Sequence, residues 1–250
     1  MIEADSRSFA DKVGFPPRSW AGPSDAAQTH GTTVLALRFD GGILMLADRR
    51  ATAGNLVMFD QAEKIFALDD TTLLAISGSF ARSLEIARFL KHSLKYYRRL
   101  TLGELSLNGK LQEISKALAG NLEMAMSGIG VFLPIVATYD PPSDAFGVYF
   151  FDGAGARFEN KEYACAGSGS ERIRGVFEYL ARSKGSWRER KLADVLMDGM
   201  YLLDIAADLD SATGGFTKTL PAARVLERTG SRTIPDSELR KAAERVLKRS

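Results

Sequence analysis

A threonine that follows a glycine near the N-terminus could become a nucleophile that carries its own base. The chain runs Gly31-Thr32-Thr33-Val34. Cleavage of the bond before Thr32 would leave a hydroxyl and a free α-amine on one residue. Such an amine has an ordinary pKa of about 7.7–8.0, so it could deprotonate the hydroxyl beside it. Glycine at 31 would let the hydroxyl reach the preceding carbonyl without a Cβ clash. The alternative is a β-branched residue that opens a strand.

Two charged residues further along the chain could support this chemistry. Lys64 lies in Glu63-Lys64-Ile65, and a cation close to Thr32 would favour deprotonation of its hydroxyl and amine. Asp48 ends an apolar run, where an unpaired carboxylate would be costly, so Lys64 is its expected partner. Taken singly, Lys64 could be a surface lysine and Asp48 a turn residue.

Three segments that contain glycine offer further polar groups. Gly167-Ser168-Gly169-Ser170 could hold a helix N-cap at Ser170 or bind phosphate, although the Lys-Ser/Thr pair of a P-loop is absent. The run Asp210-Ser211-Ala212-Thr213-Gly214-Gly215 could be a simple helix end with a glycine turn. Ser77-Gly78-Ser79 could be a turn from strand to helix.

Apolar patterns predict the elements that would position these residues. Strands are expected at 33–38, 43–47, 64–68, 72–76, 131–139, 145–151, 158–166 and 222–226. Helices are expected around 86–97, 111–122, 173–180 and 192–207, with another that opens at Pro235. Strands and helices therefore come in blocks, which favours an α+β fold of antiparallel sheets with helices outside.

Composition limits the class of protein. The 250 residues are 45% hydrophobic, enough for a sizeable core, and they contain no internal repeat or long linker. A net charge of +2 favours neither nucleic acid nor a membrane as partner. No run approaches the roughly 18–20 apolar residues of a membrane span, and no secretory signal is recognisable. A cytoplasmic location is expected.

Cysteine and histidine usage argues against other catalytic designs. Cys165 is the single cysteine, so no internal disulfide can form, and we expect a small buried strand residue. The two histidines are His30 and His92. They are too few for a histidine-rich metal site. His30 lies before the proposed cut and would be removed with the N-terminal segment. We expect no metal and no organic cofactor.

Together, these segments resemble a catalytic β subunit of the bacterial, actinobacterial-type proteasome. The resemblance rests on Thr32-Thr33-Val34, the run from Gly41 to Asn55, Lys64 and the two later glycine-containing words, in that order. It covers Thr32 to about Arg249. It implies an αββα sandwich of two antiparallel sheets flanked by helix layers, the N-terminal-nucleophile hydrolase type. Residues 1–31 would be a propeptide removed autocatalytically, and residues 32–250 the peptidase domain.

The resemblance also implies roles for individual residues. Thr32 would be the nucleophile, Asp48 and Lys64 its charged partners, and Gly31 the residue before the processed bond. Further residues would contact or hold the terminal threonine, namely Ser168, Asp210 and Thr213. The backbone N–H of Gly78 would stabilise the oxyanion. An apolar substrate pocket, favouring apolar residues on the acyl side of the cut, would be lined by Ala51, Thr52, Ala62, Ile76 and Phe80.

The function implied is that of a threonine-type endopeptidase in ATP-dependent protein degradation. Its partners would be further copies of itself in a seven-membered ring, proteasome α subunits, a ring-shaped ATPase unfoldase and unfolded polypeptide. Three alternatives stay open: a small-molecule amidohydrolase of the same design, an inactive ring member, and a subunit of the simpler two-ring bacterial protease. The presence of Thr32, Asp48 and Lys64 argues against an inactive member.

Overall fold

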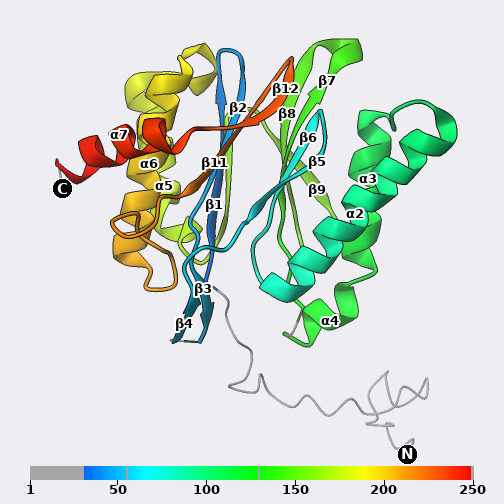
Figure 1. Ribbon diagram of the computed structural model, residues 1–250, viewed down its shortest axis with the longest axis horizontal. Coiled ribbons are helices and arrows are strands. Elements are labelled where there is room, and N and C mark those ends of the chain that lie inside the picture. The colour runs from blue at the N-terminus through cyan, green and yellow to red at the C-terminus, as the bar shows by residue number, and fades with distance from the viewer. Residues whose placement is uncertain (1–30, 55, 129, 249–250) are drawn as a thin grey trace, which may run out of the picture.

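The computed structural model describes residues 31–54, 56–128 and 130–248, which form a four-layered sandwich (Figure 1). One five-stranded sheet has the order β10 (Tyr163–Gly167), β1 (Thr33–Phe39), β2 (Gly42–Ala47), β11 (Ala222–Glu227), β12 (Gly230–Thr233). The other has the order β5 (Ile65–Asp69), β6 (Thr72–Ala75), β7 (Ile135–Asp140), β8 (Ala145–Phe151), β9 (Arg157–Asn160). Neighbouring strands are antiparallel throughout both sheets.

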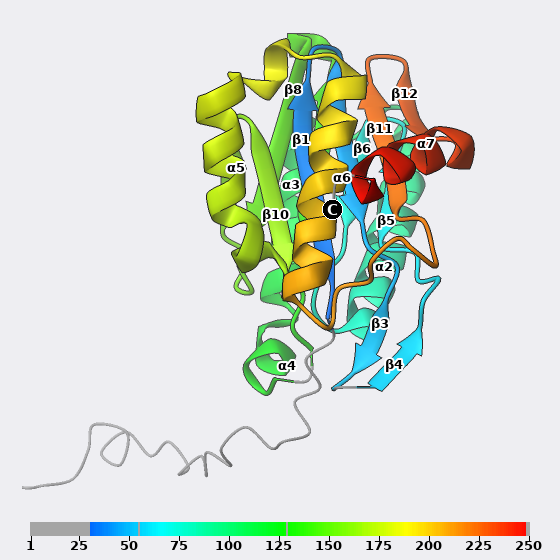
Figure 2. The ribbon, with the colours of Figure 1, turned by 90° about the vertical axis from the view of Figure 1, so that its left-hand side faces the viewer.

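Helices cover the outer face of each sheet. The first sheet is covered by α5 (Ser170–Lys184), α6 (Leu192–Leu209) and α7 (Asp236–Leu247), which stand in front of it in Figure 2. The second is covered by α2 (Phe80–Thr101) and α3 (Leu107–Ala119). Short 3₁₀ turns are η1 (Pro141–Ser143) and η2 (Trp187–Glu189). This arrangement confirms the expected αββα sandwich.

Three apolar layers hold the sandwich together. On β2, Leu44 and Leu46 pack toward the helices of the first sheet, whereas Ile43 and Met45 pack between the two sheets. The third layer lies between the second sheet and α2 and α3. Side chains alternate across a strand, so a strand covered on both faces must be apolar at successive positions. The strand expected at 43–47 is confirmed, and both of its faces are covered.

Two expected elements are each divided in the structure. The strand expected at 158–166 is two strands in different sheets, because the Asn160 side chain accepts the amides of Glu162 and Tyr163 and forms a turn. The helix expected to reach Leu122 ends at Ala119. Leu122 instead begins the short helix α4 (Leu122–Met126), after the Asn121 side chain bonds the Gly130 carbonyl.

Other differences arise where the apolar pattern is uninformative. The ribbon of β3 (Ala51–Ala53) and β4 (Leu56–Phe59) was not expected, and every side chain of β4 is exposed, so it lacks the alternation of a half-buried strand. The polar β12 was also missed. On α2, Phe89 lies on the exposed side, although it follows the buried Ile86 by three residues. Every helix among the described residues is too short or too polar to span a lipid bilayer.

Candidate active site

Strand register gathers the candidate residues at one edge of the first sheet. Thr33 at the start of β1 pairs with Gly167 at the end of β10. Val34 pairs with Ala47 at the end of β2, and Ala47 pairs with Ala222 at the start of β11. Residues that precede β1 or follow β2 and β10 therefore meet at this edge, next to the β3–β4 ribbon (Figure 1).

Thr32 is buried at this edge, with its bond to Gly31 intact. Its hydroxyl donates to the Gly31 carbonyl oxygen at 2.7 Å, and the Gly31 amide donates to the Thr52 hydroxyl at 2.9 Å. A Cβ added at position 31 would overlap the side chain of Ala212. Glycine is therefore required by packing here, in addition to the approach of the hydroxyl that the sequence suggested.

The expected ion pair between Lys64 and Asp48 is present and fully buried. Lys64 Nζ lies 2.7 Å from Asp48 Oδ1 and donates to the Arg50 carbonyl at 2.6 Å. Removal from water lowers the pKa of Lys64, and the opposing effect of the Asp48 carboxylate is smaller. Lys64 can therefore lose its proton more readily than an ordinary lysine.

Asp48 also organises the surrounding backbone. Its Oδ1 accepts the Thr33 amide at 2.8 Å, and its Oδ2 accepts the amides of Arg50 and Gly214, both at 2.9 Å. These bonds join β1, the start of the β3–β4 ribbon and the loop after α6. Multiple donors compensate the carboxylate for lost hydration.

Ser168, Asp210 and Thr213 are brought together in a hydrogen-bonded chain. Asp210 Oδ2 accepts the hydroxyls of Ser168 at 2.5 Å and of Thr213 at 2.6 Å. Thr213 Oγ1 lies 2.6 Å from Thr33 Oγ1. The resemblance led us to expect contacts with Thr32, but these hydrogen bonds lead to its neighbour, Thr33.

The helix N-cap considered for Ser170 is wrong. The N-cap position is Gly169, and Ser170 is the first residue of α5. The Ser170 hydroxyl donates backwards to the Gly167 carbonyl at 2.7 Å, because the turn leaves that oxygen within reach. Ser170 therefore stabilises the turn that presents Ser168.

Gly78 has a backbone conformation that favours glycine. Its φ is 97°, and an added Cβ would collide with the Val131 carbonyl oxygen. It forms an isolated bridge with Phe132, in which Ser77 O accepts from Leu133 N and Ser79 N donates to Val131 O. The bridge thus uses the groups on either side of Gly78, leaving its amide out. Its role toward an oxyanion stays a prediction.

The residues expected to line a substrate pocket differ in accessibility. Ala62, Ile76 and Thr52 are buried, and the Thr52 hydroxyl is already bonded to Gly31. Ala51 and Phe80 are partly exposed, so these two are the ones a substrate side chain could reach directly. The pocket as a whole stays a prediction.

Sequence reasoning gave no role to Arg50 and Gly214. The Arg50 guanidinium bonds the carbonyls of Ser211 at 3.1 Å and Thr213 at 3.3 Å, and the Asp60 carboxylate at 3.2 Å. Its backbone meanwhile contacts both Asp48 and Lys64. The signal that could have found Arg50 is its place two residues after the buried Asp48.

The remaining candidates for chemistry lie apart from this edge or outside the described residues. Cys165 is partly buried on β10, and burial raises the pKa of its thiol to about 11, as suits a structural cysteine. His92 is exposed on α2. His30 and the rest of the expected propeptide up to residue 30 lie outside the described residues. Within the described part of the chain, no group of three metal-ligating side chains occurs.

Comparisons with known proteins identify the family. Residues 28–192 match the family model described as "Proteasome subunit". A proteasome subunit beta of Streptosporangium roseum is 34% identical, over 96% of this chain and 87% of that protein. Those of Stackebrandtia nassauensis and Acidothermus cellulolyticus are 32% and 34% identical, over 98% and 91% of this chain and 91% and 79% of theirs. The chain therefore belongs to the proteasome subunit family, and over nearly its whole length it is similar to actinobacterial β subunits.

Proposed function

We propose that this chain is the precursor of a threonine endopeptidase that activates itself by cleaving the Gly31–Thr32 bond. Residues 1–31 are the propeptide and residues 32–250 the peptidase domain. The observation that carries the proposal is the Thr32 hydroxyl, 2.7 Å from the carbonyl oxygen of the bond to be cut. It lies at the sheet edge that also holds the buried Lys64–Asp48 pair.

Self-cleavage follows as an acyl shift from nitrogen to oxygen. Thr32 Oγ1 attacks the Gly31 carbonyl carbon, the peptide C–N bond breaks, and the hydroxyl proton passes to the departing amine. Water then hydrolyses the ester, which leaves a carboxylate on Gly31 and a free amine on Thr32. Before cleavage the α-amine does not exist, so Lys64, with its lowered pKa, is the base available for the first step.

Peptide hydrolysis repeats this chemistry on a substrate. The Thr32 α-amine accepts the hydroxyl proton while Oγ1 forms an ester with the substrate acyl group. The amine product leaves with that proton, and water then releases the acid. The positive charge of protonated Lys64 favours deprotonation of the Thr32 hydroxyl and keeps its α-amine in the neutral form. A backbone donor at the Gly78 position would contribute about 10²–10³ in rate.

The family supports a place in the proteasome core particle. We infer assembly into seven-membered rings, partnered by α subunits and supplied with unfolded polypeptide by a ring-shaped ATPase in the cytoplasm. No cofactor takes part. Enclosure has a physical rationale, because an endopeptidase with broad specificity is harmless only when folded proteins cannot reach its nucleophile.

The test is the intact mass and N-terminal sequence of the chain after co-expression with its α partner. Wild type is expected to lose residues 1–31, whereas Thr32→Ala keeps them. Thr101→Ala, at the exposed end of α2, is the matched control and should be processed normally. An uncut wild-type chain in a fully assembled particle would contradict the mechanism. Processed particles are then assayed for hydrolysis of peptides with an apolar residue before the cut.

A further inference from the structure

We propose that Thr33 is the positioning residue for the nucleophile, and that its hydroxyl aligns Thr32 through Thr213 and Asp210. The proposal rests on the proposed function, because it concerns the same site. Thr33 is fully buried. It is held from two sides: its amide donates to Asp48 Oδ1 at 2.8 Å, and its hydroxyl lies 2.6 Å from that of Thr213.

The direction of the hydrogen bonds follows from counting protons. A threonine hydroxyl has one proton to donate, and that of Thr213 goes to Asp210 Oδ2 at 2.6 Å. Thr33 must therefore be the donor to Thr213. Asp210 also accepts the exposed Ser168 hydroxyl, so one carboxylate orients a chain of hydroxyls that ends at the buried Thr33.

Local packing confines this chain. A Cβ added to Gly169 would collide with the hydroxyl oxygens of both Thr33 and Thr213, and one added to Gly167 would collide with the Thr32 carbonyl oxygen. The Gly167–Gly169 turn thus closes tightly over the start of β1. A buried hydroxyl without a partner would be costly, and valine suits a strand equally well. The bond to Thr213 therefore accounts for a threonine at position 33.

Processing makes this anchor important. Once the Gly31–Thr32 bond is cut, Thr32 is a chain end whose single covalent attachment is to Thr33. The orientation of the Thr32 amine and hydroxyl then depends on how rigidly Thr33 is held. A displacement of about 1 Å can reduce a rate by about 10²-fold. Loss of the Thr33 hydroxyl should therefore lower kcat with little effect on substrate binding.

The experiment compares Thr33→Val and Thr33→Ser in the full chain, co-expressed with the α partner. Valine keeps the volume and β-branching but removes the donor, whereas serine keeps the donor. We expect Thr33→Val to slow processing and, in the processed particle, to lower kcat about 10–100-fold with KM changed less than about twofold. Thr33→Ser should restore kcat to within about threefold of wild type.

Two controls separate positioning from general damage. Thr138→Val removes another buried strand hydroxyl, on β7, which donates to the Gly147 carbonyl at 3.4 Å. It should leave kcat unchanged. Thr33→Val combined with Thr213→Val should be little worse than Thr213→Val alone, because both remove the same interaction.

The outcomes distinguish this proposal from the proposed function. Normal kcat and processing in Thr33→Val, or a loss that Thr33→Ser does not restore, would overturn the positioning role while leaving Thr32 as nucleophile. Processing that persists in Thr32→Ala would instead overturn the proposed function itself. Slow processing in Thr33→Val, restored by serine, supports the anchor.

Discussion

At the scale of single residues, the pair of Lys64 and Asp48 contributes more to the chemistry of the site than to the stability of the fold. Burying two charges costs hydration that their attraction only partly returns, and this cost appears as the lowered pKa of Lys64. Asp48 offsets its own burial with three backbone amides in addition to Lys64. The arrangement keeps a lysine of reduced basicity at the sheet edge where Thr32 lies.

Replacing Lys64 by methionine should slow processing strongly and destabilise the fold. The change leaves the Asp48 carboxylate buried without its cation, which typically costs about 3–5 kcal/mol. We expect the low end, about 3 kcal/mol, because the backbone donors remain. Processing should fall by about 10²–10⁴-fold. Denaturant titration and intact mass measure the two effects.

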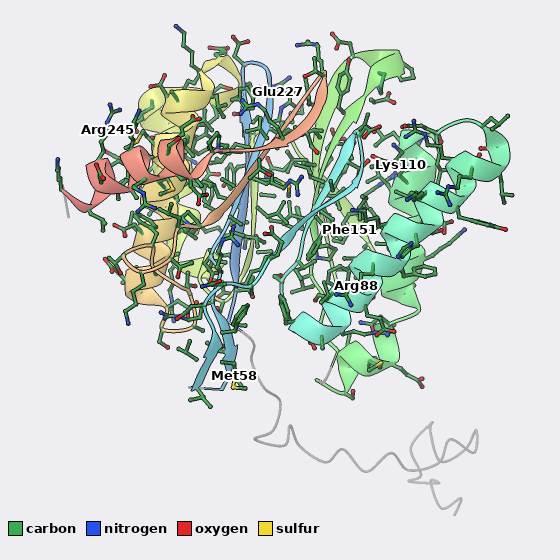
Figure 3. The ribbon with its side chains drawn as sticks, in the orientation of Figure 1. Met58, Arg88, Lys110, Phe151, Glu227 and Arg245 are labelled. Atoms are coloured by element: carbon green, nitrogen blue, oxygen red, sulfur yellow. The ribbon has the colours of Figure 1, made fainter. Side chains whose placement is uncertain are left out.

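Lys110→Met is the matched control for this substitution. Lys110 is also buried and lies 2.7 Å from Asp69, but it belongs to α3 on the other side of the sandwich (Figure 3). The Lys110→Met chain should be less stable than wild type yet be processed normally. A Lys64→Met chain that processes at the wild-type rate would exclude Lys64 from the chemistry.

Cys165 should behave as an inert thiol while the chain is folded. Its pKa is raised from 9.0 to about 11, so the thiolate fraction at pH 8 is about a hundredfold below that of the unfolded chain. Folding retains the proton between pH 9 and 11, where the unfolded chain releases it. Cys165 therefore contributes stability below pH 9 that is lost as pH rises through about 11.

Alkylation by iodoacetamide at pH 8 measures this difference directly. The folded chain should react about a hundredfold more slowly than the chain in urea. Equal rates would show that the thiol is neither buried nor shifted. Cys165→Ser should also flatten the fall in unfolding free energy between pH 9 and 11.

At the scale of elements, α6 shows why a glycine can persist inside a helix. Gly199 faces the first sheet, and a Cβ there would collide with Leu46 Cδ1 on β2 and lie 3.1 Å from Leu37 Cδ1 on β1. Both leucines are fully buried, so their side chains cannot move aside into solvent. Close packing of helix on sheet thus outweighs the helix propensity that alanine would add.

Two substitutions of glycine by alanine should therefore change the free energy of unfolding in opposite directions. Gly199→Ala should lower the free energy of unfolding by about 1 kcal/mol. Overpacking costs about 2 kcal/mol, which exceeds the gain in helix propensity of about 1 kcal/mol. Gly175→Ala on α5 meets no atom within 4 Å and should gain about 0.5–1 kcal/mol. Chemical denaturation of the two variants measures both. A stabilising Gly199→Ala would show that α6 does not pack closely against Leu46.

At the scale of the whole molecule, the outer face of α2 exposes two large aromatic side chains. Phe89 and Tyr96 are 59% and 65% exposed, and they lie two helical turns apart on one side. Basic side chains run beside them at Arg88, Lys95 and Arg99, and Figure 3 marks Arg88 on this helix. Exposed aromatic side chains are enriched at protein–protein interfaces, so we expect this face of α2 to contact another subunit.

Replacing both aromatic residues by glutamine should impair assembly without unfolding the chain. Exposed substitutions of this kind change stability by about 0.5 kcal/mol or less, while an interface loses its large apolar contacts. Native mass spectrometry of the co-expressed subunits should show fewer complete particles. The exchange Phe89→Tyr with Tyr96→Phe keeps the aromatic area and should assemble. Normal assembly of the glutamine variant would exclude this face as an interface.

Much of the layered fold was predictable, because buried strands and helices leave strong apolar patterns. The runs at 33–38, 43–47 and 222–226 correspond to β1, β2 and β11. The ribbon of β3 and β4 was not predictable, because its outer strand is exposed on both faces. The division of 158–166 was missed, because the Asn160 turn depends on one side chain within an otherwise strand-like segment.

The sequence by itself determined which chemistry is available: a threonine after a glycine, a lysine and an aspartate at apolar strand ends, and hydroxyls beside glycines. The tertiary structure decided how these groups connect. Antiparallel register places the start of β1 beside the ends of β2 and β10, so that Asp48 binds both Lys64 and the Thr33 amide. It also decided that the hydrogen bonds from Asp210 lead through Thr213 to Thr33. A hydrogen bond forms or is lost when the distance between its two atoms changes by a few tenths of an ångström. The spacing of residues along a sequence does not specify such distances.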